Sequence, residues 1–450
     1  MKAYKEYKDS GIEWIGEIPE HWNRIRIKHL VKIKVCDGPH ETPEFVEEGV
    51  PFISADAIQN GQVNFQRKRG NITKETFAEY AKKSKVINGD ILFCKSGSTT
   101  GKSAIVKTNE SFAIWSPLAI IRANEHLVDN YYLYSFIQSN LFRLQVENSW
   151  TFGTQPNIGM GTLENLWIPI PTSKEQTQIA NYLDYKTSLI DRLIEKNQRL
   201  IELLEEKRSA IINQAVTKGL NPNVKMKDSG IEWIGEIPEH WKITRLDYES
   251  DVIDPQPDHR APQVDENGLP YIGIRDINYD GSINIETTRK VQELAVKKQE
   301  ESFTVDDGDI VFCKVGTLGL PKHIIKPKIR FAISATLVLI KVSKFNDSRF
   351  IKYLLESNYI NNQVENNSTG STRKALGIQI IRKFKFLIME LKEQTQIANY
   401  LDYKTAQIDK LVVEKRKTNE YLKEYTTTLI SNVVTGKVDV RDIKIPENSN

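Results

Sequence analysis

The stretch KDSGIEWIGEIPEHW occupies Lys8–Trp22, and the same residues occur without a change at Lys227–Trp241. A second perfect repeat, KEQTQIANYLDYKT, occupies Lys174–Thr187 and Lys392–Thr405. The two repeats have nearly equal offsets of 219 and 218 residues, so the chain consists of two tandem copies of one unit. Between the identical blocks the copies diverge heavily. This pattern favours one scaffold that is used twice to carry two modules with different recognition specificities.

Length and composition bound the class of protein. With 450 residues the chain should hold more than one domain, and 39 % hydrophobic and 27 % charged residues are typical of a soluble globular protein. No apolar run has the length of a membrane span. The first ten residues, MKAYKEYKDS, lack the apolar stretch of a signal peptide, so we expect a cytoplasmic protein without a membrane partner.

Cysteine usage and charge add little evidence for a particular chemistry. Cys36, Cys94 and Cys313 lie far apart, which predicts reduced and mostly buried thiols, and no cysteine pair has the spacing of a metal site. The net charge of +3 is compatible with nucleic-acid binding. Local basic clusters at Arg67–Arg69 and Lys82–Lys83 fit either a DNA-facing surface or an ordinary solvated face.

Each diverged interval carries strand signals at equivalent places. The run GDILFCK at Gly89–Lys95 matches GDIVFCK at Gly308–Lys314, and short β-branched and aromatic runs between turn residues predict strands. Helices are predicted over Tyr131–Val146 and Arg349–Val364. Each interval is therefore predicted to be a mixed α and β domain in which strands outnumber helices.

Two longer helical segments follow the mixed domains. The first, Lys174–Val216, contains no glycine or proline, and its apolar residues recur at heptad spacing around one polar interruption at Asn197. The second, Lys392–Val434, repeats this seam with Lys415 in the place of Asn197. A single helix cannot bury such a seam alone, so we expect the two to pair as an antiparallel coiled coil in which Asn197 and Lys415 fix the register. A long external partner helix is the alternative.

The ends of the first long helix also carry signals. Ser173 and Gln176 fit a capping box at its start, and Gly219 lies just past its end. In the repeated block that precedes each domain, the apolar residues are expected to pack on that domain: Trp14, Ile15, Ile18 and Trp22. Aromatic stacking on DNA bases is the alternative for this block. An identical block, however, is a poor place to encode two different specificities.

The stretch GSTTGKS at Gly97–Ser103 resembles a nucleotide-binding phosphate loop, but it has three residues between its glycines where the motif requires four. The second copy lacks the Lys-Ser pair. We interpret the stretch either as a turn between two strands or as a polar loop near a phosphate backbone. No amino-methyltransferase motif, glycine-rich cofactor loop or zinc-protease histidine pair occurs, so the sequence gives no positive sign of catalysis or of a bound cofactor.

Taken together, these blocks resemble a known family. WIGEIPEHW before each domain, GDI(L/V)FCK within it and KEQTQIANYL at the start of each long helix, in duplicate and in this order, are similar to the specificity subunit of a bacterial type I restriction-modification system. The resemblance covers nearly the whole chain. One departure is that Leu391 stands where the first copy has Ser173, so the start of the second helix is expected to lack that cap.

The resemblance implies an α+β chain with two tandem target recognition domains, separated by two long helices and related by a pseudo-twofold internal duplication. Each domain would read one half of a bipartite site on double-stranded DNA. The helices would bind two methyltransferase subunits, which carry S-adenosylmethionine and modify adenine, and motor-nuclease subunits would join for cleavage. The expected parts are a docking segment 1–22, domain 23–172, helix 173–219, docking segment 220–241, domain 242–391, helix 392–436 and tail 437–450.

Two alternatives to this function stay open at this point. A coiled-coil scaffold that joins two protein-binding domains would show no salt-dependent affinity for DNA. A phosphate-loop nucleotide hydrolase would bind ATP in a manner that depends on Lys102, although the motif is broken.

Candidate DNA-binding residues lie in two polar loops of each copy. The first loop is expected to contact phosphates. In the second, the offset of 218 residues places Gln155 against Arg373, and glutamine can pair with adenine as arginine can with guanine. An ordinary solvent-exposed loop is the alternative for this segment. The full candidate set is Lys95, Ser96, Ser98, Thr99, Lys102, Thr151, Thr154, Gln155, Lys314, Thr317, Thr369, Thr372, Arg373 and Lys374.

Overall fold

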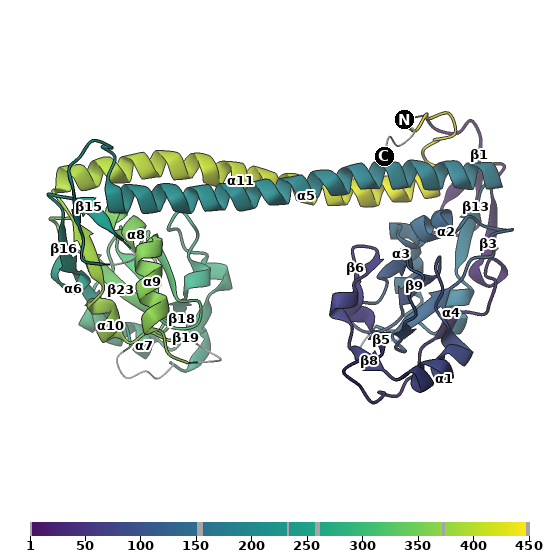
Figure 1. Ribbon diagram of the computed structural model, residues 1–450, viewed down its shortest axis with the longest axis horizontal. Helices are drawn as coiled ribbons and strands as arrows, with labels where there is room; N and C mark the ends of the chain where they lie inside the picture. Colours follow the sequence, from purple (N-terminus) through teal and green to yellow (C-terminus); the bar gives the residue numbers. More distant parts are fainter. Residues whose placement is uncertain (1, 151–155, 232–233, 257–261, 371–373, 447–450) are drawn as a thin grey trace. The chain divides into compact units, whose positions relative to one another are not determined.

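The computed structural model of the chain describes residues 2–150, 156–231, 234–256, 262–370 and 374–446. It divides into two compact units, one formed by Met1–Asn197 with Lys417–Asn450 and the other by Gln198–Arg416. Each unit therefore holds one mixed domain and a part of each long helix (Figure 1).

The mixed domain of the first unit is built on a four-stranded antiparallel sheet. The strands of the first unit as a whole are β1 Tyr7–Asp9, β2 Glu17–Pro19, β3 Asn23–Arg26, β4 Cys36–Asp37, β5 Val50–Ile53, β6 Ile58–Gln59, β7 Gln62–Val63, β8 Gly70–Ile72, β9 Ile91–Cys94, β10 Ser103–Ile105, β11 Ala113–Ile114, β12 Leu118–Ile121 and β13 Trp167–Ile170. The main sheet has the order β10-β9-β12-β4. Smaller sheets have the orders β11-β5-β8, β13-β3, β6-β7 and β1-β2.

Strand β9, which was predicted from the run Gly89–Lys95, lies at the centre of this domain and is fully buried. Because successive side chains of a strand point to opposite faces, Ile91 and Phe93 join the larger core of the unit, while Leu92 and Cys94 join a second core on the other face of the sheet. Both faces of the main sheet are therefore covered, which explains a continuous apolar run in place of an alternating one.

The helices of this domain are α1 Lys74–Ser84, α2 Asn130–Ile137, α3 Asn140–Asn148 and α4 Met160–Glu164, with 3-10 turns at Ile27–His29, Ala55–Ala57 and Phe65–Arg67. The prediction of one helix over Tyr131–Val146 is wrong, because Ser139 separates α2 from α3. The backbone of Ser139 is extended, and its hydroxyl accepts a hydrogen bond from the N–H of Phe142 at 3.2 Å. A serine in this geometry caps a new helix and does not continue the old one.

The second unit has the same strand order on its own main sheet. Its strands are β14 Met226–Asp228, β15 Glu236–Pro238, β16 Lys242–Arg245, β17 Ser250–Ile253, β18 Val264–Ile272, β19 Arg289–Val291, β20 Ile310–Cys313, β21 Gly319–His323, β22 Ala332–Ile333, β23 Leu337–Val342 and β24 Lys385–Ile388. The main sheet runs β17-β23-β20-β21, and the smaller sheets run β19-β18-β22, β16-β24 and β14-β15. Its strands therefore match β4-β12-β9-β10, β8-β5-β11, β3-β13 and β1-β2 of the first unit.

The second unit also repeats the helix break. Its helices are α6 Leu246–Glu249, α7 Glu293–Ser302, α8 Ser348–Glu356, α9 Asn358–Asn367 and α10 Ile378–Arg382, with 3-10 turns at Ile274–Asp276 and Ile285–Thr287. The predicted helix Arg349–Val364 is likewise two helices, because Ser357 has an extended backbone between α8 and α9.

The long helices are α5 Ser173–Lys218 and α11 Leu391–Val434. The capping box of α5 lies one residue earlier than predicted. The hydroxyl of Thr172 accepts from the N–H of Glu175 at 3.4 Å, while the Glu175 carboxylate accepts from the N–H of Thr172 at 3.3 Å. Gln176 instead accepts the backbone N–H of Asp129 at 2.7 Å, which ties the helix to the mixed domain. Gly219 has φ +76°, as expected of a glycine just past a helix end.

Within each unit the segments of α5 and α11 run in opposite directions. In the second unit Arg208 Nε lies 2.9 Å from Asp409 Oδ1, and Glu205 Oε1, earlier on α5, lies 2.7 Å from Arg416 Nη2, later on α11. Apolar side chains fill the space between the helices there: Ile201, Ile408 and Val412.

In the first unit Asn197 on α5 meets Asn419 on α11, and both are buried. The partner of Asn197 is thus a residue that the sequence analysis did not single out. Lys415 is half-buried in the second unit, and its role in helix register stays a prediction.

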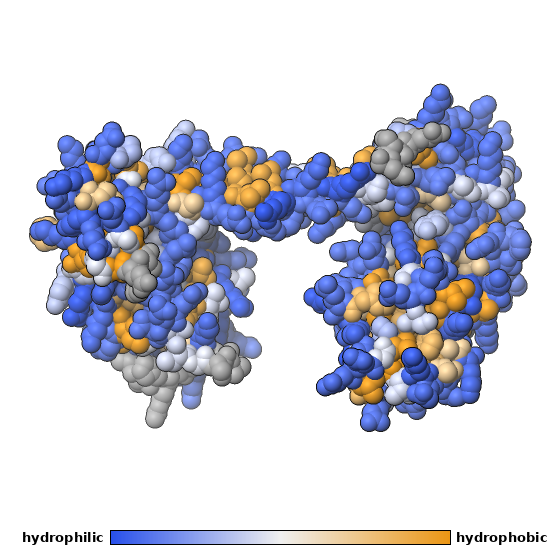
Figure 2. Space-filling view, in the orientation of Figure 1, coloured by the Kyte–Doolittle hydropathy of each residue, from blue (hydrophilic) through white to orange (hydrophobic). Residues whose placement is uncertain are grey.

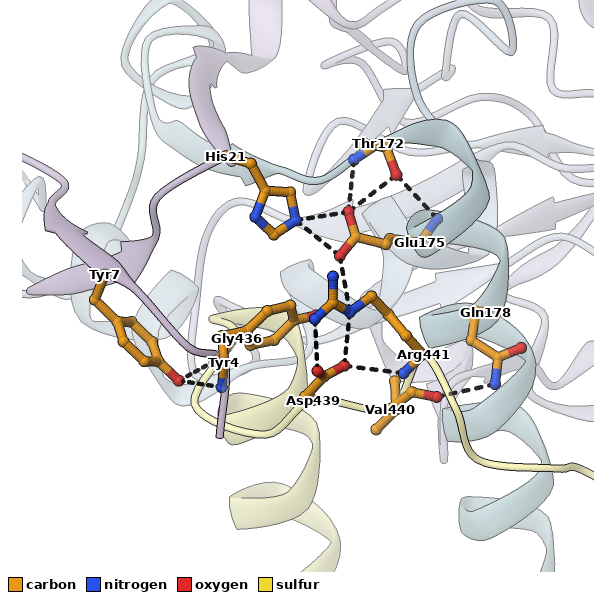
Figure 3. A network of polar contacts seen from close by, with 10 residues as sticks. All are labelled: Tyr4, Tyr7, His21, Thr172, Glu175, Gln178, Gly436, Asp439, Val440 and Arg441. Carbon is orange, nitrogen blue, oxygen red and sulfur yellow. Dashed lines mark hydrogen bonds and ion pairs between the residues drawn. The ribbon is translucent and has the colours of Figure 1, made fainter. Parts of the chain in front are cut away.

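A polar network at the start of α5 joins the two ends of the chain (Figure 3). His21 Nε2 lies 2.9 Å from Glu175 Oε1, Arg441 Nε lies 3.7 Å from the same oxygen, and Arg441 Nη2 lies 2.7 Å from Asp439 Oδ2. Burial alone would raise the pKa of Glu175, but the hydrogen bonds from His21 and Thr172 outweigh it and hold this pKa below its usual range. The repeated block, the start of α5 and the C-terminal segment therefore form one structure in the first unit.

Candidate nucleic-acid interface

The loop between β9 and β10 carries five of the predicted DNA-binding residues, from Lys95 to Lys102, and it is a tight hairpin. The N–H of Cys94 donates to the carbonyl of Lys102 at 2.8 Å, and the N–H of Gly101 donates to the carbonyl of Cys94 at 2.9 Å. Gly97 and Gly101 have φ of +85° and +93°, a region that favours glycine. A nucleotide-binding phosphate loop leads from a strand into a helix, so this strand-to-strand turn argues against the nucleotide hydrolase.

The residues at the C-terminal side of the second predicted loop, Pro156 and Lys374, lie beside this hairpin in their respective units. In the first unit the N–H of Gly97 donates to the carbonyl of Pro156 at 3.0 Å, and in the second the N–H of Gly316 donates to the carbonyl of Lys374 at 2.9 Å. These hydrogen bonds occupy equivalent positions. In the second unit the candidate Lys374 therefore lies next to the first loop in space, although the two are distant in the sequence.

Several candidates of the second loop cannot be placed. The following lie outside the described residues: Thr151, Thr154, Gln155, Thr372 and Arg373. The two others are exposed, and Thr369 exchanges backbone hydrogen bonds of 3.0 and 2.9 Å with Ala375. Thr369 and Ala375 are thus paired as an isolated antiparallel bridge, and Lys374 is the residue before Ala375.

Lys95 and Lys314, the two lysines expected to lie beside phosphates, point into their own domains. Lys95 Nζ lies 3.2 Å from Asp37 Oδ2, and Lys314 Nζ lies 2.6 Å from Asp254 Oδ2. Their side chains are only 12 % and 5 % exposed. These ion pairs hold the ends of β9 and β20 to the interior of their own domains. Their geometry argues against the phosphate contacts expected of both lysines.

The remaining candidates of the first loop differ in accessibility. Ser98 and Lys102 in the first unit and Thr317 in the second are exposed, while Ser96 and Thr99 are half-buried. Lys102 belongs to no ion pair within the described part of the chain. An exposed ammonium on a glycine-bearing turn can approach a phosphate without first breaking an internal contact.

The surroundings of Asp37 add basic residues that the candidate set missed. Lys83 Nζ lies 2.8 Å from Asp37 Oδ1 and His40 Nε2 lies 3.3 Å from Asp37 Oδ2, and both of these side chains are largely exposed. Burial alone would raise the pKa of Asp37, but the hydrogen bonds from Lys83 and Lys95 outweigh it and hold this pKa below its usual range. One buried carboxylate is therefore surrounded by two lysines and a histidine, which leaves excess positive charge at the surface.

An arginine stacked on an aromatic ring lies close to this cluster. The guanidinium of exposed Arg69 is 4.0 Å from the ring centroid of Trp115, and the N–H of Ser116 donates to the carbonyl of Pro39 at 3.0 Å, beside His40. The basic runs around Arg69 and Lys83 were the signals that could have found this surface. Neither Asp37 nor Trp115 stands in a recognisable pattern.

The second unit has a related stack made of different residues. Arg289 lies 5.7 Å from the ring centroid of Tyr271, and Tyr271 Oη accepts the N–H of Ala335 at 2.7 Å. The position of Trp115 is taken by Ser334 in this unit. Each domain thus places an arginine over an aromatic ring at its three-stranded sheet, but the rings come from different positions, and Tyr271 is buried.

Other kinds of site find no support in the described parts of the chain. There, no three histidine, cysteine, aspartate or glutamate side chains gather so that they could hold a metal ion. Likewise, no helix in those parts is long and apolar enough to cross a bilayer.

Comparison with known proteins gives one consistent family. The family model described as "Type I restriction modification DNA specificity domain" matches residues 19–205 and 257–424. The chain is 26 % identical to the type I restriction enzyme MjaVIII specificity subunit of Methanocaldococcus jannaschii, over 98 % of this chain and 99 % of that one. It is 22 % identical to the EcoKI specificity subunit of Escherichia coli, over 90 % of this chain and 86 % of that one.

A solved structure has a similar fold. It concerns the assembly and conformational transition of the type I R-M system, and the chain matched there has a TM-score of 0.68 with 15 % sequence identity. The match covers 94 % of this chain and 99 % of that one. The mixed α/β tandem fold is therefore shared with this system.

Proposed function

Because the chain belongs to the family of type I restriction-modification DNA specificity domains, we propose that each of its mixed domains reads one half of a bipartite DNA site. In this proposal the paired polar loops of each domain face the duplex. Exposed serine, threonine and lysine side chains contact phosphates, and residues of the second loop read base edges.

One observation carries the proposal. The two domains share the strand order of the main sheet and of the other sheets that both possess, and equivalent hydrogen bonds occur beside their hairpins at Gly97 and Gly316. Yet the side chains around these hairpins differ. Lys102 on the first hairpin has no lysine at its counterpart, and Trp115, on a different connection, is replaced by Ser334. A constant framework with different surface groups is what two readers of different sequences require. Two modules related by a pseudo-twofold duplication suit a split site on B-DNA.

We assign the long helices two roles. They pair as an antiparallel coiled coil that sets the spacing of the half-sites, and they bind methyltransferase subunits. The opposed directions of α5 and α11 in each unit and the Asn197–Asn419 contact support the first role. Exposed apolar side chains on the helices support the second: Leu189, Leu193, Leu200, Leu203, Leu411 and Val413. Figure 2 shows a hydrophobic patch on the surface of the helices.

In this proposal the chemistry resides on partners. Two methyltransferase subunits supply S-adenosylmethionine and modify adenine, and motor-nuclease subunits join for cleavage. The chain itself acts as a non-catalytic recognition subunit in the cytoplasm. The alternative of a protein-binding scaffold predicts no affinity for DNA, whereas the proposed function predicts an affinity that falls steeply with salt.

The direct test is methylome sequencing of the host with this gene present and deleted. We expect one bipartite methylated adenine motif to vanish from the deletion strain and to return on complementation. An unchanged methylome, in a host whose methyltransferase gene is expressed, would refute the proposal.

A further inference from the structure

The connection from β3 to β4 in the first unit carries an unbroken series of positive charges. It reads RIRIKHLVKIK at 24–34, with two arginines, three lysines and a histidine but no acidic residue. Lys28, Lys32 and Lys34 are exposed, and none of the five arginines and lysines forms an ion pair within the described part of the chain. We call residues 24–34 the basic strip. Such a concentration of unpaired cations suits a polyanionic partner.

The apolar residues of the basic strip and of the position after it anchor the connection to the core of the first unit. Ile27, Leu30 and Val35 are buried, and the N–H of Val35 donates to Glu164 Oε1 at 2.9 Å. Glu164 is only 8 % exposed, so its charge is not presented at the surface beside the lysines. The cations therefore stand on an ordered backbone, which lowers the entropic cost of binding compared with a free segment.

The two arginines of the basic strip lie against one aromatic ring. The guanidinium groups of Arg24 and Arg26 are 5.2 and 4.6 Å from the ring centroid of Trp167, which lies opposite Arg26 in the pairing of β3 with β13. Arg26 Nη1 also donates to Asn165 Oδ1 at 3.1 Å, and its Nε is buried without a hydrogen-bond partner. Stacking of this kind orients both guanidinium groups without neutralising their charge.

The basic strip leads into the candidate nucleic-acid interface. It ends three residues before Asp37, the carboxylate that exposed Lys83 and His40 approach from the surface. The helix α4, which follows the second predicted loop, contacts the 3-10 turn Ile27–His29 of the basic strip. A DNA strand held at the candidate interface can therefore continue along the basic strip.

The position of the basic strip in the first unit indicates which part of the DNA it meets. Strand β13, the partner of β3, leads within a few residues into the start of α5 at Ser173, whereas the first unit ends at Asn197. The helix rises roughly 36 Å between these two residues. The basic strip thus lies at the end of this α5 segment away from the part of the helix that continues beyond the unit. DNA at that end flanks the half-site, because in the proposed function the helices span the spacer.

The second unit does not repeat the basic strip. Its equivalent connection, Lys242–Ile253, holds two basic and three acidic residues. Asp247 stands where the first copy has Lys28, at an offset of 219 residues, and it forms an ion pair with Arg245. Both units have the same arrangement of the strands on either side of this connection. The shared framework therefore does not explain the charge of the basic strip.

We propose that the basic strip binds the phosphates of duplex DNA that flanks the first half-site, beyond the base pairs that the loops recognise, so that the chain holds the two flanks of its site unequally. This rests on the proposed function, which supplies the DNA and its two half-sites. An acidic protein surface would also neutralise cations. The continuity of the basic strip with the candidate interface, and the dense row of charges along a DNA strand, favour DNA.

The test compares duplexes that differ in one flank. Each duplex carries the methylated motif and either stops at its edges or extends beyond one half-site by about 15 base pairs, roughly one and a half helical turns. The chain in complex with the methyltransferase subunits of the same system is titrated by fluorescence anisotropy at several salt concentrations. We expect extension of one flank to strengthen binding about 10-fold more than extension of the other, with a salt slope steeper by about 3.

The triple variant Lys28→Gln, Lys32→Gln and Lys34→Gln should lose this difference between the flanks and bind the short duplex as the unaltered protein does, because its lysines make no internal ion pair. The matched control is the triple variant Lys326→Gln, Lys328→Gln and Lys344→Gln, which removes the same charge from exposed positions of the second unit and should keep the difference. Thermal melts should show that both variants fold.

Three outcomes would decide against these ideas. Equal effects of the two flanks on the unaltered complex, or a difference that the basic-strip variant keeps, would overturn the proposed contact with flanking DNA. Loss of methyltransferase subunits from this variant, with the flank difference intact, would make the basic strip a protein contact and overturn the proposal as well. Absence of any motif-specific binding by the unaltered complex would overturn the proposed function instead.

Discussion

The side-chain amides of Asn197 and Asn419 form a 2.8 Å hydrogen bond from Nδ2 to Oδ1, across the pair of α5 and α11. Both residues are almost completely buried, at 6 % and 8 % exposure, in a seam that is otherwise largely apolar. A buried amide pair of this kind contributes little to net stability but is satisfied only in one register, because a shift of either helix leaves both amides without a partner.

Replacing both asparagines by leucine should therefore remove the constraint on helix register without lowering the stability of the protein. Asn197→Leu alone should destabilise the protein by about 1–3 kcal/mol, because it leaves the buried amide of Asn419 unpaired. The double leucine variant should melt at a higher temperature than either single variant and at or above that of the unaltered protein. Calorimetric melts of all four proteins give the coupling as a double-mutant cycle. A double variant less stable than both singles would contradict this account.

Lys102→Ala should weaken binding to every DNA sequence by about the same factor and lower the salt slope of the affinity by about 1, because the exposed ammonium is expected to contact a phosphate. Fluorescence anisotropy with matched and mismatched duplexes at several salt concentrations measures both quantities. A loss confined to one sequence would indicate that Lys102 reads bases.

Lys95→Ala makes a contrasting case on the same loop. Because Lys95 is buried against Asp37, its removal should lower the melting temperature of the domain and leave the salt slope of the folded protein unchanged. Lys83 still pairs with Asp37 and limits the damage. A lower salt slope without any loss of stability would restore Lys95 as a phosphate contact.

Much of the architecture follows from the sequence, and the exceptions have physical reasons. The repeats predicted two copies of one structural unit. The heptad segments, which lack glycine and proline, predicted α5 and α11 to within a few residues, because a glycine with a left-handed backbone marks the end of a helix clearly. The break at Ser139 was missed because apolar periodicity continues across it, and only the cap geometry shows that a second helix begins.

The candidate site was harder to predict. Whether the residues of its two loops bind DNA stays a prediction. The ion pair of Lys95 with Asp37 joins residues that are far apart in the sequence, and no local pattern indicates it. Trp14 illustrates the same limit, because it is 37 % exposed and the expectation that it packs on the domain is wrong in part. Its block contains four large apolar residues, and the sequence alone does not say which of them stays outside the core.

Exchange of residues 242–391 for the same interval of a relative should change one half of the methylated motif and leave the other half intact. The spacer length should stay with the helices, because the exchange leaves both of them in place apart from the first residue of α11. Methylome sequencing of cells that carry the chimaera determines both half-sites of the motif and the length of the spacer in one experiment. A motif in which both halves change would contradict independent recognition domains.

The network that joins the chain ends should weaken in acid. Interactions with His21 and with Arg441 hold the pKa values of Glu175 and Asp439 below their usual range, so both carboxylates stabilise the fold above a pH of about 4 and lose that contribution as the pH falls through their folded pKa values. Arg441→Gln should cost about 1 kcal/mol at pH 7, since Arg441 is partly exposed, and much less near pH 3. Urea unfolding at a series of pH values measures the difference, and a cost independent of pH would exclude this origin.

Arg373 offers the sharpest test of base recognition. It lies outside the described residues, but the carbonyl of its neighbour Lys374 accepts the N–H of Gly316 in the β20–β21 turn. An arginine that pairs with guanine O6 and N7 contributes roughly 1–3 kcal/mol of discrimination. Arg373→Ala should therefore relax one position of one half-site by about 10- to 100-fold and leave the other half-site unchanged, while Gln155→Ala should do the converse. Binding selections on randomised duplexes report both changes. Uniformly weaker binding with an unchanged motif would make Arg373 a phosphate contact, and no effect at all would identify the segment as an ordinary surface loop.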